Sequence, residues 1–306
     1  MTIQDSRSEY AKRMHRVLEH VDRHLDAALE LSTLAAVANF SPFHFHRLFS
    51  AWTGETVGDY LRRRRLEVGA LRLVSQPGTT VLQVALSVGF GSSEAFARAF
   101  KVHFGASPTA WRARERKHRN PDQMKRNPDQ ESRAGSAHFP TSPSNHREVV
   151  MKVTLIERKP ANIAYMRHVG AYGEPISKFW QTVVAPWMGT NNLFGHVRYG
   201  ISHDDPGIAS PERARYDAGV EVDSNFSGTG DYHTTLIPGG RYACAHFSGT
   251  TADIVGAWAK LLREWLPESG MQLDSRPFFE YYDQNAKFDP KTGVFSCDLC
   301  IPVVAL

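Results

Sequence analysis

The sequence predicts a chain of two domains: an all-α N-terminal domain with two helix-turn-helix units, and an α+β C-terminal domain of two βαββ half-repeats. Three observations support this fold class. Residues 41–54 recur in altered form as residues 92–105. Residues 116–149 contain almost no apolar residues, which is typical of a flexible linker. From residue 151 the apolar pattern changes from helical to strand-like.

Each copy of the repeat is predicted to form a short helix with marked ends. The copies SPFHFHRLFSAWTG and SSEAFARAFKVHFG align at an offset of 51, which places Arg47 on Arg98. Ser41 is a favourable N-cap, and Gly54 suits the left-handed residue after the last turn. Helical spacing predicts one buried apolar face in the first copy, made by Phe45, Leu48, Phe49 and Trp52.

A second short helix is predicted before each copy, at residues 31–40 and 81–90, and each ends in Phe at a turn. Thr80 and Gln83 fit a capping box. Two helices joined by a tight turn form a helix-turn-helix, although a single copy would equally fit a helical hairpin in a bundle. Residues 56–76 predict one connecting helix. About 19 residues would rise roughly 28 Å, which suits two helices entering successive major grooves about 34 Å apart.

Residues 8–115 resemble the DNA-binding domain of the AraC/XylS family of transcription regulators. The signature is carried by Val84, Ala85, Val88, Gly89, Phe90, Phe96, Arg98, Phe100, Lys101, Gly105, Ser107, Pro108, Trp111 and Arg112. The resemblance implies that outward residues of both second helices read DNA bases, which here are Phe43, His46, Arg47, Ser93, Glu94 and Arg98. Phe43 could contact a thymine methyl and Glu94 a cytosine amine, or either could cover the helix shoulder. We expect Arg62–Arg65 to face phosphate and water.

The charge distribution favours a nucleic-acid module joined to a second module that does not touch nucleic acid. Residues 1–115 carry 15 Lys+Arg and 11 Asp+Glu, a balance of +4, and residues 116–150 carry 7 and 4, a balance of +3. Residues 151–306 carry 14 and 17, a balance of −3. We expect a DNA-binding domain at 1–115, a linker at 116–149 and a second domain at 150–306, with no need for a rigid interface.

The remaining composition predicts a cytoplasmic protein without cofactor or metal. The polar N-terminus lacks the apolar segment of a signal peptide, and no stretch reaches 18 consecutive apolar residues, so no membrane is expected as a partner. Three cysteines indicate a reducing compartment. His20 and His24 lack a third metal ligand, and Cys297 and Cys300 would lie on opposite faces of a strand.

The C-terminal domain is predicted to contain the same order of elements twice. The expected strands of the first half are 152–158, 162–169, 196–202 and 216–222, and those of the second half are 231–237, 241–247, 277–283 and 295–303. An amphipathic helix follows the second strand of each half, after Gly170 and after Gly249. We expect the two half-sheets to join, with both helices packed across one face.

This half resembles the GyrI-like small-molecule-binding domain over nearly all of residues 151–306. The resemblance is carried by GGRYACAHFSG, WLPESG, RPFFEYY and DLCIPV. It implies that Glu280 binds a ligand. A carboxylate among aromatic side chains is costly to desolvate unless a partner such as a cation binds it, and aromatic faces add about 0.5–2 kcal/mol each. Alternatively, Glu280 faces solvent.

Aromatic residues at helical and strand spacing are the other candidates for the ligand site, although tryptophans in this pattern also fit a plain core. They are Tyr282, Trp180, Trp187, Trp258 and Tyr172. Asp217 is either a pseudo-symmetric counterpart of Glu280 or, as we expect, an exposed strand residue.

The layout resembles that of Rob-type regulators. It implies a sequence-specific DNA-binding transcription regulator, not an enzyme, whose C-terminal domain binds a small cationic or aromatic effector. The expected partners are double-stranded DNA, this effector and RNA polymerase. One alternative is a GyrI-like small-molecule hydrolase fused to a DNA-binding domain, with Glu280 and a nearby tyrosine as base and acid. Another is a C-terminal domain that binds only protein.

Overall fold

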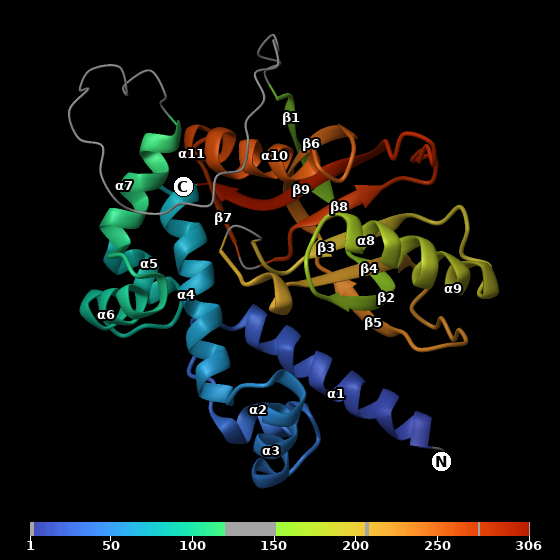
Figure 1. Ribbon diagram of the computed structural model, residues 1–306, viewed down its shortest axis with the longest axis horizontal. Coiled ribbons are helices and arrows are strands. Elements are labelled where there is room, and N and C mark those ends of the chain that lie inside the picture. Colours follow the sequence, from blue (N-terminus) through green and yellow to red (C-terminus); the bar gives the residue numbers. More distant parts are fainter. Residues whose placement is uncertain (1–2, 120–150, 206–207, 275, 306) are drawn as a thin grey trace.

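The computed structural model describes residues 3–119, 151–205, 208–274 and 276–305 (Figure 1). Most of the predicted linker, residues 120–150, therefore lies outside the described residues. The N-terminal half contains helices α1 (Ile3–Arg23), α2 (Leu31–Val37), α3 (Pro42–Thr53), α4 (Val57–Ser75), α5 (Val81–Ser87), α6 (Ser93–Phe104) and α7 (Pro108–Arg119). None of the described helices has the length and apolar character needed to cross a membrane.

The two predicted helix-turn-helix units are α2–α3 and α5–α6, and their ends are built alike. The hydroxyls of Ser41 and Ser92 accept from the backbone N–H three residues on, at 3.4 and 3.1 Å. Gly54 and Gly105 end the second helices with φ of 76° and 71°, in the left-handed region that favours glycine. The local sequence signals therefore fixed both ends of each helix as expected.

The turns inside the two units also match. Asn39 and Gly89 adopt φ of 53° and 80°. The backbone N–H of the next residue, Phe40 or Phe90, donates to the carbonyl five residues earlier at 2.9 Å in both copies. Helix α4 runs between the units, with α2–α3 near one end and α5–α6 near the other (Figure 1).

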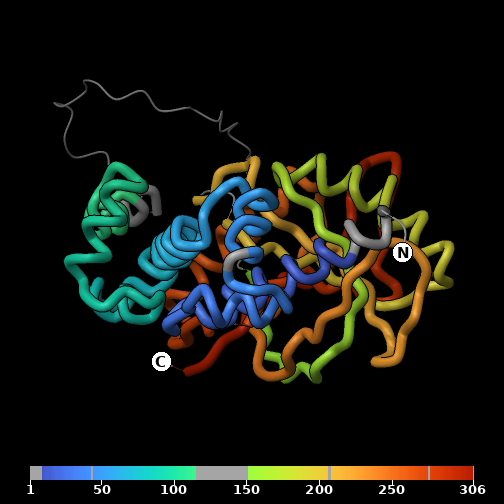
Figure 2. The backbone as a smooth tube through the Cα atoms, turned by 90° about the horizontal axis from the view of Figure 1, so that it is seen from below, coloured from blue at the N-terminus to red at the C-terminus, as the bar shows by residue number. Residues whose placement is uncertain are grey.

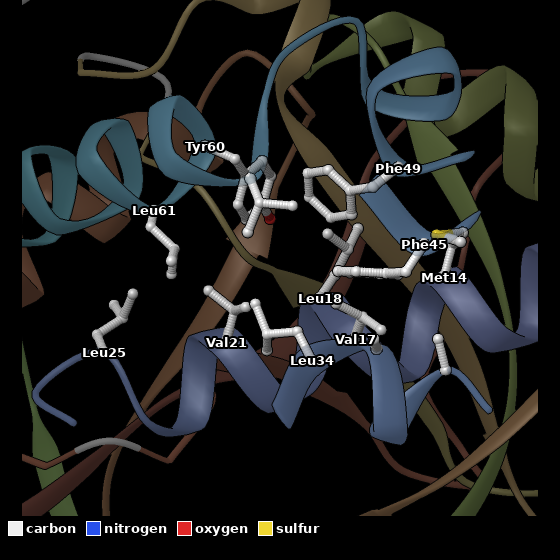
Figure 3. Packing of buried hydrophobic residues seen from close by; sticks show 13 residues of the cluster. Met14, Val17, Leu18, Val21, Leu25, Leu34, Phe45, Phe49, Tyr60 and Leu61 are labelled. Carbon is white, nitrogen blue, oxygen red and sulfur yellow. The ribbon is translucent and has the colours of Figure 1, made fainter. Parts of the chain in front are cut away.

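Paired phenylalanines anchor each unit in its own core. Phe45 and Phe49 are fully buried with α1 and α4, as Figure 3 shows. Phe96 and Phe100 are buried in a second core with α4 and α7. The expectation for Trp52 was only partly right: its side chain is 42% exposed and lies at the edge of the core, with its ring 5.2 Å from that of His15.

The prediction that Arg62–Arg65 face phosphate and water was wrong for three of the four residues. Only Arg62 is exposed. Arg63 pairs with Glu55 at 2.6 Å, and Arg65 donates to the carbonyl of Leu25 at 2.9 Å. Arg64 is 3% exposed and binds carboxylates of both domains. The reason is that α4 is surrounded by protein on most of its circumference, so Arg64 is buried, Arg63 and Arg65 are partly covered, and Arg62 alone of the run is exposed.

The C-terminal half is a curled antiparallel sheet with helical segments. Its strands are β1 (Val153–Arg158), β2 (Ala161–Val169), β3 (Arg198–Ser202), β4 (Arg215–Glu221), β5 (His233–Ile237), β6 (Gly240–Gly249), β7 (Met271–Leu273), β8 (Phe279–Tyr282) and β9 (Phe295–Ala305). The helical segments are α8 (Glu174–Phe179), η2 (Trp180–Val184), α9 (Ala185–Thr190), η3 (Pro211–Arg213), α10 (Ile254–Lys260), η4 (Leu261–Trp265) and α11 (Leu266–Glu268). Segments η2 and η4 are π-helical turns.

The two half-sheets join as predicted, but they exchange their first strands. The main strand order is β1-β6-β9-β8-β3-β4-β2-β5, with β7 paired to β9. Strand β1 of the first half therefore pairs with β6 of the second half, and β5 of the second half pairs with β2 of the first. The halves meet where β3 pairs with β8, and Gly200 lies opposite Glu280 at this junction.

Helix α1 runs along the C-terminal domain in both views (Figures 1 and 2). The hydroxyl of Tyr165 on β2 donates to Glu19 Oε1 of α1 at 2.7 Å. The rings of His15 and His233 are 4.2 Å apart at the same contact. Burial is the main cause that lowers the pKa of His15 to about 2, so this imidazole is neutral at the interface.

An ion network joins the two domains between α1, α4 and β4. Arg64 of α4 contacts Asp22 of α1 at 3.1 Å and also pairs with Asp204. Arg215 of β4 pairs with the same two carboxylates, at 2.9 Å to Asp22 and 3.1 Å to Asp204. Burial raises the pKa of Asp22, but Arg215 and Arg64 outweigh it and lower the value to about 2. The domains thus share a charge-paired interface, which the linker composition did not predict.

Candidate nucleic-acid interface and ligand cavity

The outer face of α3 carries the first set of predicted base-reading residues. His46 and Arg47 are exposed. Phe43 belongs to α3, but its side chain falls outside the described part of the structure. The buried phenylalanines on the opposite side of α3 fix the rotation of the helix, so that these polar residues point outward.

The outer face of α6 carries the second set. Arg98 and Glu94 are exposed, and Ser93 is half-buried. Ser93 Oγ donates to Glu94 Oε1 at 3.0 Å. The backbone N–H of the first turn lowers the pKa of the Glu94 carboxyl, with smaller contributions from Ser92 and Ser93. Glu94 is therefore partly engaged in capping α6, whereas Arg98 extends from the following turn.

A cavity of about 610 Å³ lies between the helical segments and the face of the sheet that carries Glu280. Five of the six predicted ligand residues line it. They are Glu280, Tyr282, Trp180, Trp258 and Tyr172. Its size is within the range of small-molecule sites.

Glu280 is buried at the wall of this cavity, with 6% of its surface exposed, so the alternative that it faces solvent was wrong. The hydroxyls of Tyr216 and Tyr282 both donate to its Oε2, at 2.9 and 2.8 Å. Among the described residues, no hydrogen bond reaches Oε1. Burial raises the pKa of the carboxyl, and the two tyrosine hydroxyls partly oppose this rise.

Two tryptophans complete the polar edge of the site. Trp180 Nε1 donates to the Tyr216 hydroxyl at 3.0 Å, which extends the chain of hydrogen bonds from Glu280. Trp258 Nε1 is buried and lacks hydrogen-bond geometry to any described partner, although it is close enough to Glu280 to oppose the rise in pKa. A ligand acceptor in the cavity could take this N–H.

Glu280 differs from the two other carboxylates that line the cavity. Asp204 pairs with Arg64 and Arg215, and Asp205 lies 3.9 Å from Arg263. Within the described structure no cation lies within 4 Å of the Glu280 carboxylate. Arg198 lies beside the Tyr282 ring, with its guanidinium 5.6 Å from the ring centre, rather than on the Glu280 carboxylate. The same guanidinium donates to the carbonyl of Ala286. The described residues thus leave the charge of an ionised Glu280 without a paired cation.

Two expectations for this half were wrong. Trp187 is absent from the residues that line the cavity, and its Nε1 donates to the carbonyl of Thr229 at 2.9 Å. Its side chain belongs to the core behind the cavity wall, together with Tyr216. A π-helical turn over Trp180–Val184 interrupts the α-helical spacing from which a shared face of Trp180 and Trp187 was predicted. Asp217 is 2% exposed and pairs with Arg167 at 2.6 Å, so it is not a surface residue.

Sequence reasoning missed Tyr216 and Gly200. Tyr216 holds Glu280, and a Cβ at Gly200 would collide with both the Tyr216 hydroxyl and Glu280 Oε2. The signal for Gly200 was its position inside a strand, where glycine often marks a close approach. Leu71 was also missed: it lines the cavity although it belongs to α4.

In the described ranges no cluster of three or more His, Cys, Asp or Glu side chains has the arrangement of a metal site. Cys300 faces Cys244 on β6, with the two sulfurs 2.9 Å apart.

Comparison with known proteins identifies two family profiles in the chain. Residues 151–304 match the GyrI-like small-molecule-binding domain, and residues 34–114 match a helix-turn-helix domain. The chain is 24% identical over 291 residues to the Right origin-binding protein of Escherichia coli strain K12, covering 92% of this chain and 95% of that protein.

Shorter matches concern the N-terminal half. The regulatory protein SoxS of Escherichia coli strain K12 is 30% identical over 107 residues, which cover 34% of this chain and 97% of SoxS. The solved DNA-binding domain of the global transcriptional factor AdpA, in complex with a target DNA, is 32% identical. The match covers 36% of this chain and 98% of that domain, with a TM-score of 0.33.

Proposed function

This chain belongs to the AraC-type DNA-binding transcription regulators with a C-terminal GyrI-like small-molecule-binding domain, and we propose that its effector is a small aromatic cation that pairs with Glu280. The observation that carries the proposal is the buried Glu280 carboxylate, which lines an aromatic cavity without a cationic partner within 4 Å in the described structure. We further propose domain limits of 1–115 and 150–306 with a linker at 116–149, and RNA polymerase as a protein partner.

For the DNA-binding half, we propose that the outward residues of α3 and α6 read bases. These residues are Phe43, His46, Arg47, Ser93, Glu94 and Arg98. The exposure of Arg47 and Arg98 at matched positions of two similarly built helices supports this proposal. An arginine in the major groove can bind guanine through two hydrogen bonds, which distinguishes it from a phosphate contact.

Replacing Arg47 or Arg98 with alanine should each weaken binding to the preferred duplex by about 1–3 kcal/mol, roughly 5- to 150-fold in Kd. The preferred duplex would be selected from a random library by the purified protein, and Kd measured by fluorescence anisotropy at fixed salt. Each variant should also lose selectivity at one base pair.

Arg62→Ala is a suitable control, because Arg62 is exposed on the connecting helix α4 rather than on α3 or α6. It should change affinity for the preferred and the random duplex by the same factor. An equal loss on both duplexes for Arg98→Ala would contradict base reading by that residue.

For the effector half, the preference for a cation follows from desolvation. An unpaired carboxylate in a buried site is costly, and a ligand cation removes that cost by pairing with it. The faces of Trp180, Trp258 and Tyr282 supply further attraction to a cation and a large apolar contact area. Burial raises the pKa of Glu280, which reflects the same cost of desolvating the carboxylate before a ligand binds.

Tetraphenylphosphonium should therefore bind the full chain at least about tenfold more tightly than neutral triphenylphosphine oxide, equivalent to about 1.4 kcal/mol. Isothermal titration calorimetry measures both affinities directly. The two probes share aryl surface and differ in charge, so equal affinities would exclude recognition of the cation and would leave only an apolar site.

A further inference from the structure

The effector cavity is not built by the C-terminal domain alone. Leu71 of α4 is the one described residue of the DNA-binding half that lines it. We propose that Leu71 contacts the bound effector, and that effector occupancy changes DNA affinity through α4. This inference rests on the proposed function of the cavity as the effector site.

Leu71 lies half-buried against the core of the C-terminal domain. That core includes Leu262 of η4 and Trp258 of α10, and both of these residues also line the cavity. Any ligand that fills this end of the cavity therefore lies against a side chain of α4.

A second contact joins α4 to the cavity wall, on the side of the helix that carries Leu71. Arg64 precedes Leu71 by seven residues, so the two side chains share one face of α4. Arg64 pairs with Asp204 and donates to the carbonyl of His203 at 3.0 Å, and both of these residues line the cavity. Occupancy can thus act on α4 at two points, two turns apart.

Tyr172 connects the cavity wall to the ion network by hydrogen bonds. It lines the cavity, and its hydroxyl donates to the carbonyl of Arg215 at 2.5 Å. The backbone N–H of Asp204 in turn donates to the Tyr172 hydroxyl at 3.4 Å. A ligand that displaces Tyr172 therefore disturbs Asp204, which pairs with Arg64, and Arg215, which shares Asp204 and Asp22 with Arg64.

Other sides of α4 contact the second helix-turn-helix unit directly. A Cβ on Gly69 would lie 2.8 Å from the ring of Phe96, so α4 and α6 are in close contact there. Arg72 donates to the carbonyl of Ser87, at the end of α5, at 2.8 Å. A shift of α4 is therefore transmitted to α6, which carries Arg98.

Coupling of this kind requires that the effector favour one arrangement of α4 over another. It is reciprocal, because effector and DNA change each other's affinity by the same factor. Typical couplings change affinity by about 5- to 150-fold. Saturating tetraphenylphosphonium should therefore change the Kd of the full chain for its selected duplex by at least about fivefold. The duplex should change the Kd for tetraphenylphosphonium by the same factor.

Leu71→Ala is the decisive variant. It removes the α4 contact with the effector, so binding of tetraphenylphosphonium should weaken, and with the probe at saturation the coupling factor should fall at least about twofold below that of wild type. If the probe binds wild type but leaves its DNA affinity unchanged, the coupling is overturned and the proposed effector site stands. If Leu71→Ala keeps the full coupling factor, the role of Leu71 is overturned.

If tetraphenylphosphonium does not bind, the proposed cationic effector is overturned. The coupling between cavity and DNA can then still be tested by a measurement without ligand. Leu71→Trp places bulk into the cavity from α4 and should change DNA affinity at least about fivefold. The matched control is Leu155→Trp, an exposed site on β1 with no cavity contact. Equal DNA affinities of these two variants, both folded by circular dichroism, would overturn the coupling itself.

Discussion

Replacing Arg64 with methionine should lower the free energy of unfolding by about 3–5 kcal/mol. Methionine fills a similar volume but leaves Asp22 and Asp204 with Arg215 as their shared cation. The loss is large because two carboxylates then share one cation, and Asp204 is buried, where an uncompensated charge is far more costly than on the surface. Urea unfolding followed by tryptophan fluorescence measures the change.

Arg62→Met provides a matched control two positions earlier on the same helix. Arg62 is exposed, so the identical substitution should change stability by no more than about 0.5 kcal/mol. Equal unfolding curves for Arg62→Met and Arg64→Met would mean that the ion network does not hold the two domains together in solution.

Replacing Glu280 with glutamine should weaken binding of tetraphenylphosphonium by about 2–5 kcal/mol. Glutamine keeps the shape of the side chain and can still accept from Tyr216 and Tyr282, but it lacks the negative charge. Binding of neutral triphenylphosphine oxide should stay almost unchanged, as should DNA affinity without ligand. Calorimetry on both probes separates loss of charge recognition from general damage.

Glu157→Gln is the control for this substitution, because Glu157 lies exposed on β1, away from the cavity, and pairs with exposed Arg241. It should bind both probes as wild type does. Unchanged affinity of Glu280→Gln for the cation would remove Glu280 from the effector site.

The affinity for the cation should depend on pH through the ionisation of Glu280. Burial raises the pKa of this carboxyl above its usual 4.5 in the ligand-free protein. Affinity for the cation should therefore be highest above the raised pKa, where Glu280 is ionised, and fall as the pH decreases through it. The fall should begin at a higher pH than for an exposed glutamate. Calorimetric titrations at several pH values should show this fall in wild type and a flat profile in Glu280→Gln.

The elements that the sequence predicted best depend on local contacts. The Thr80–Gln83 capping box is formed, with Gln83 Oε1 accepting from the Thr80 backbone N–H at 2.8 Å. Helix caps, turn residues and apolar spacing are all set within a few residues of the chain, so a short sequence carries the whole signal. The same holds for Glu280, whose burial was inferred from its aromatic strand neighbours.

The features that sequence reasoning missed depend on residues far apart in the chain. Nothing near Arg64 indicates that Asp204, from the other domain, will pair with it. The run of four arginines resembles a phosphate-binding face until the packing of the second domain is known. Trp187 was misplaced because a π-helical turn changed the helical phase, and a single sequence gives little warning of such a turn.

The exchange of first strands between the two halves has a consequence for synthesis of the chain. Strand β1 is the first of the domain to be made, yet its partner β6 follows only after β4 and β5. Until then β1 has no partner strand, and completion of the sheet must wait for distant segments. The nascent effector domain therefore completes its fold late, and for that interval the Leu71 and Arg64 side chains of the earlier-made helices remain without their final surroundings.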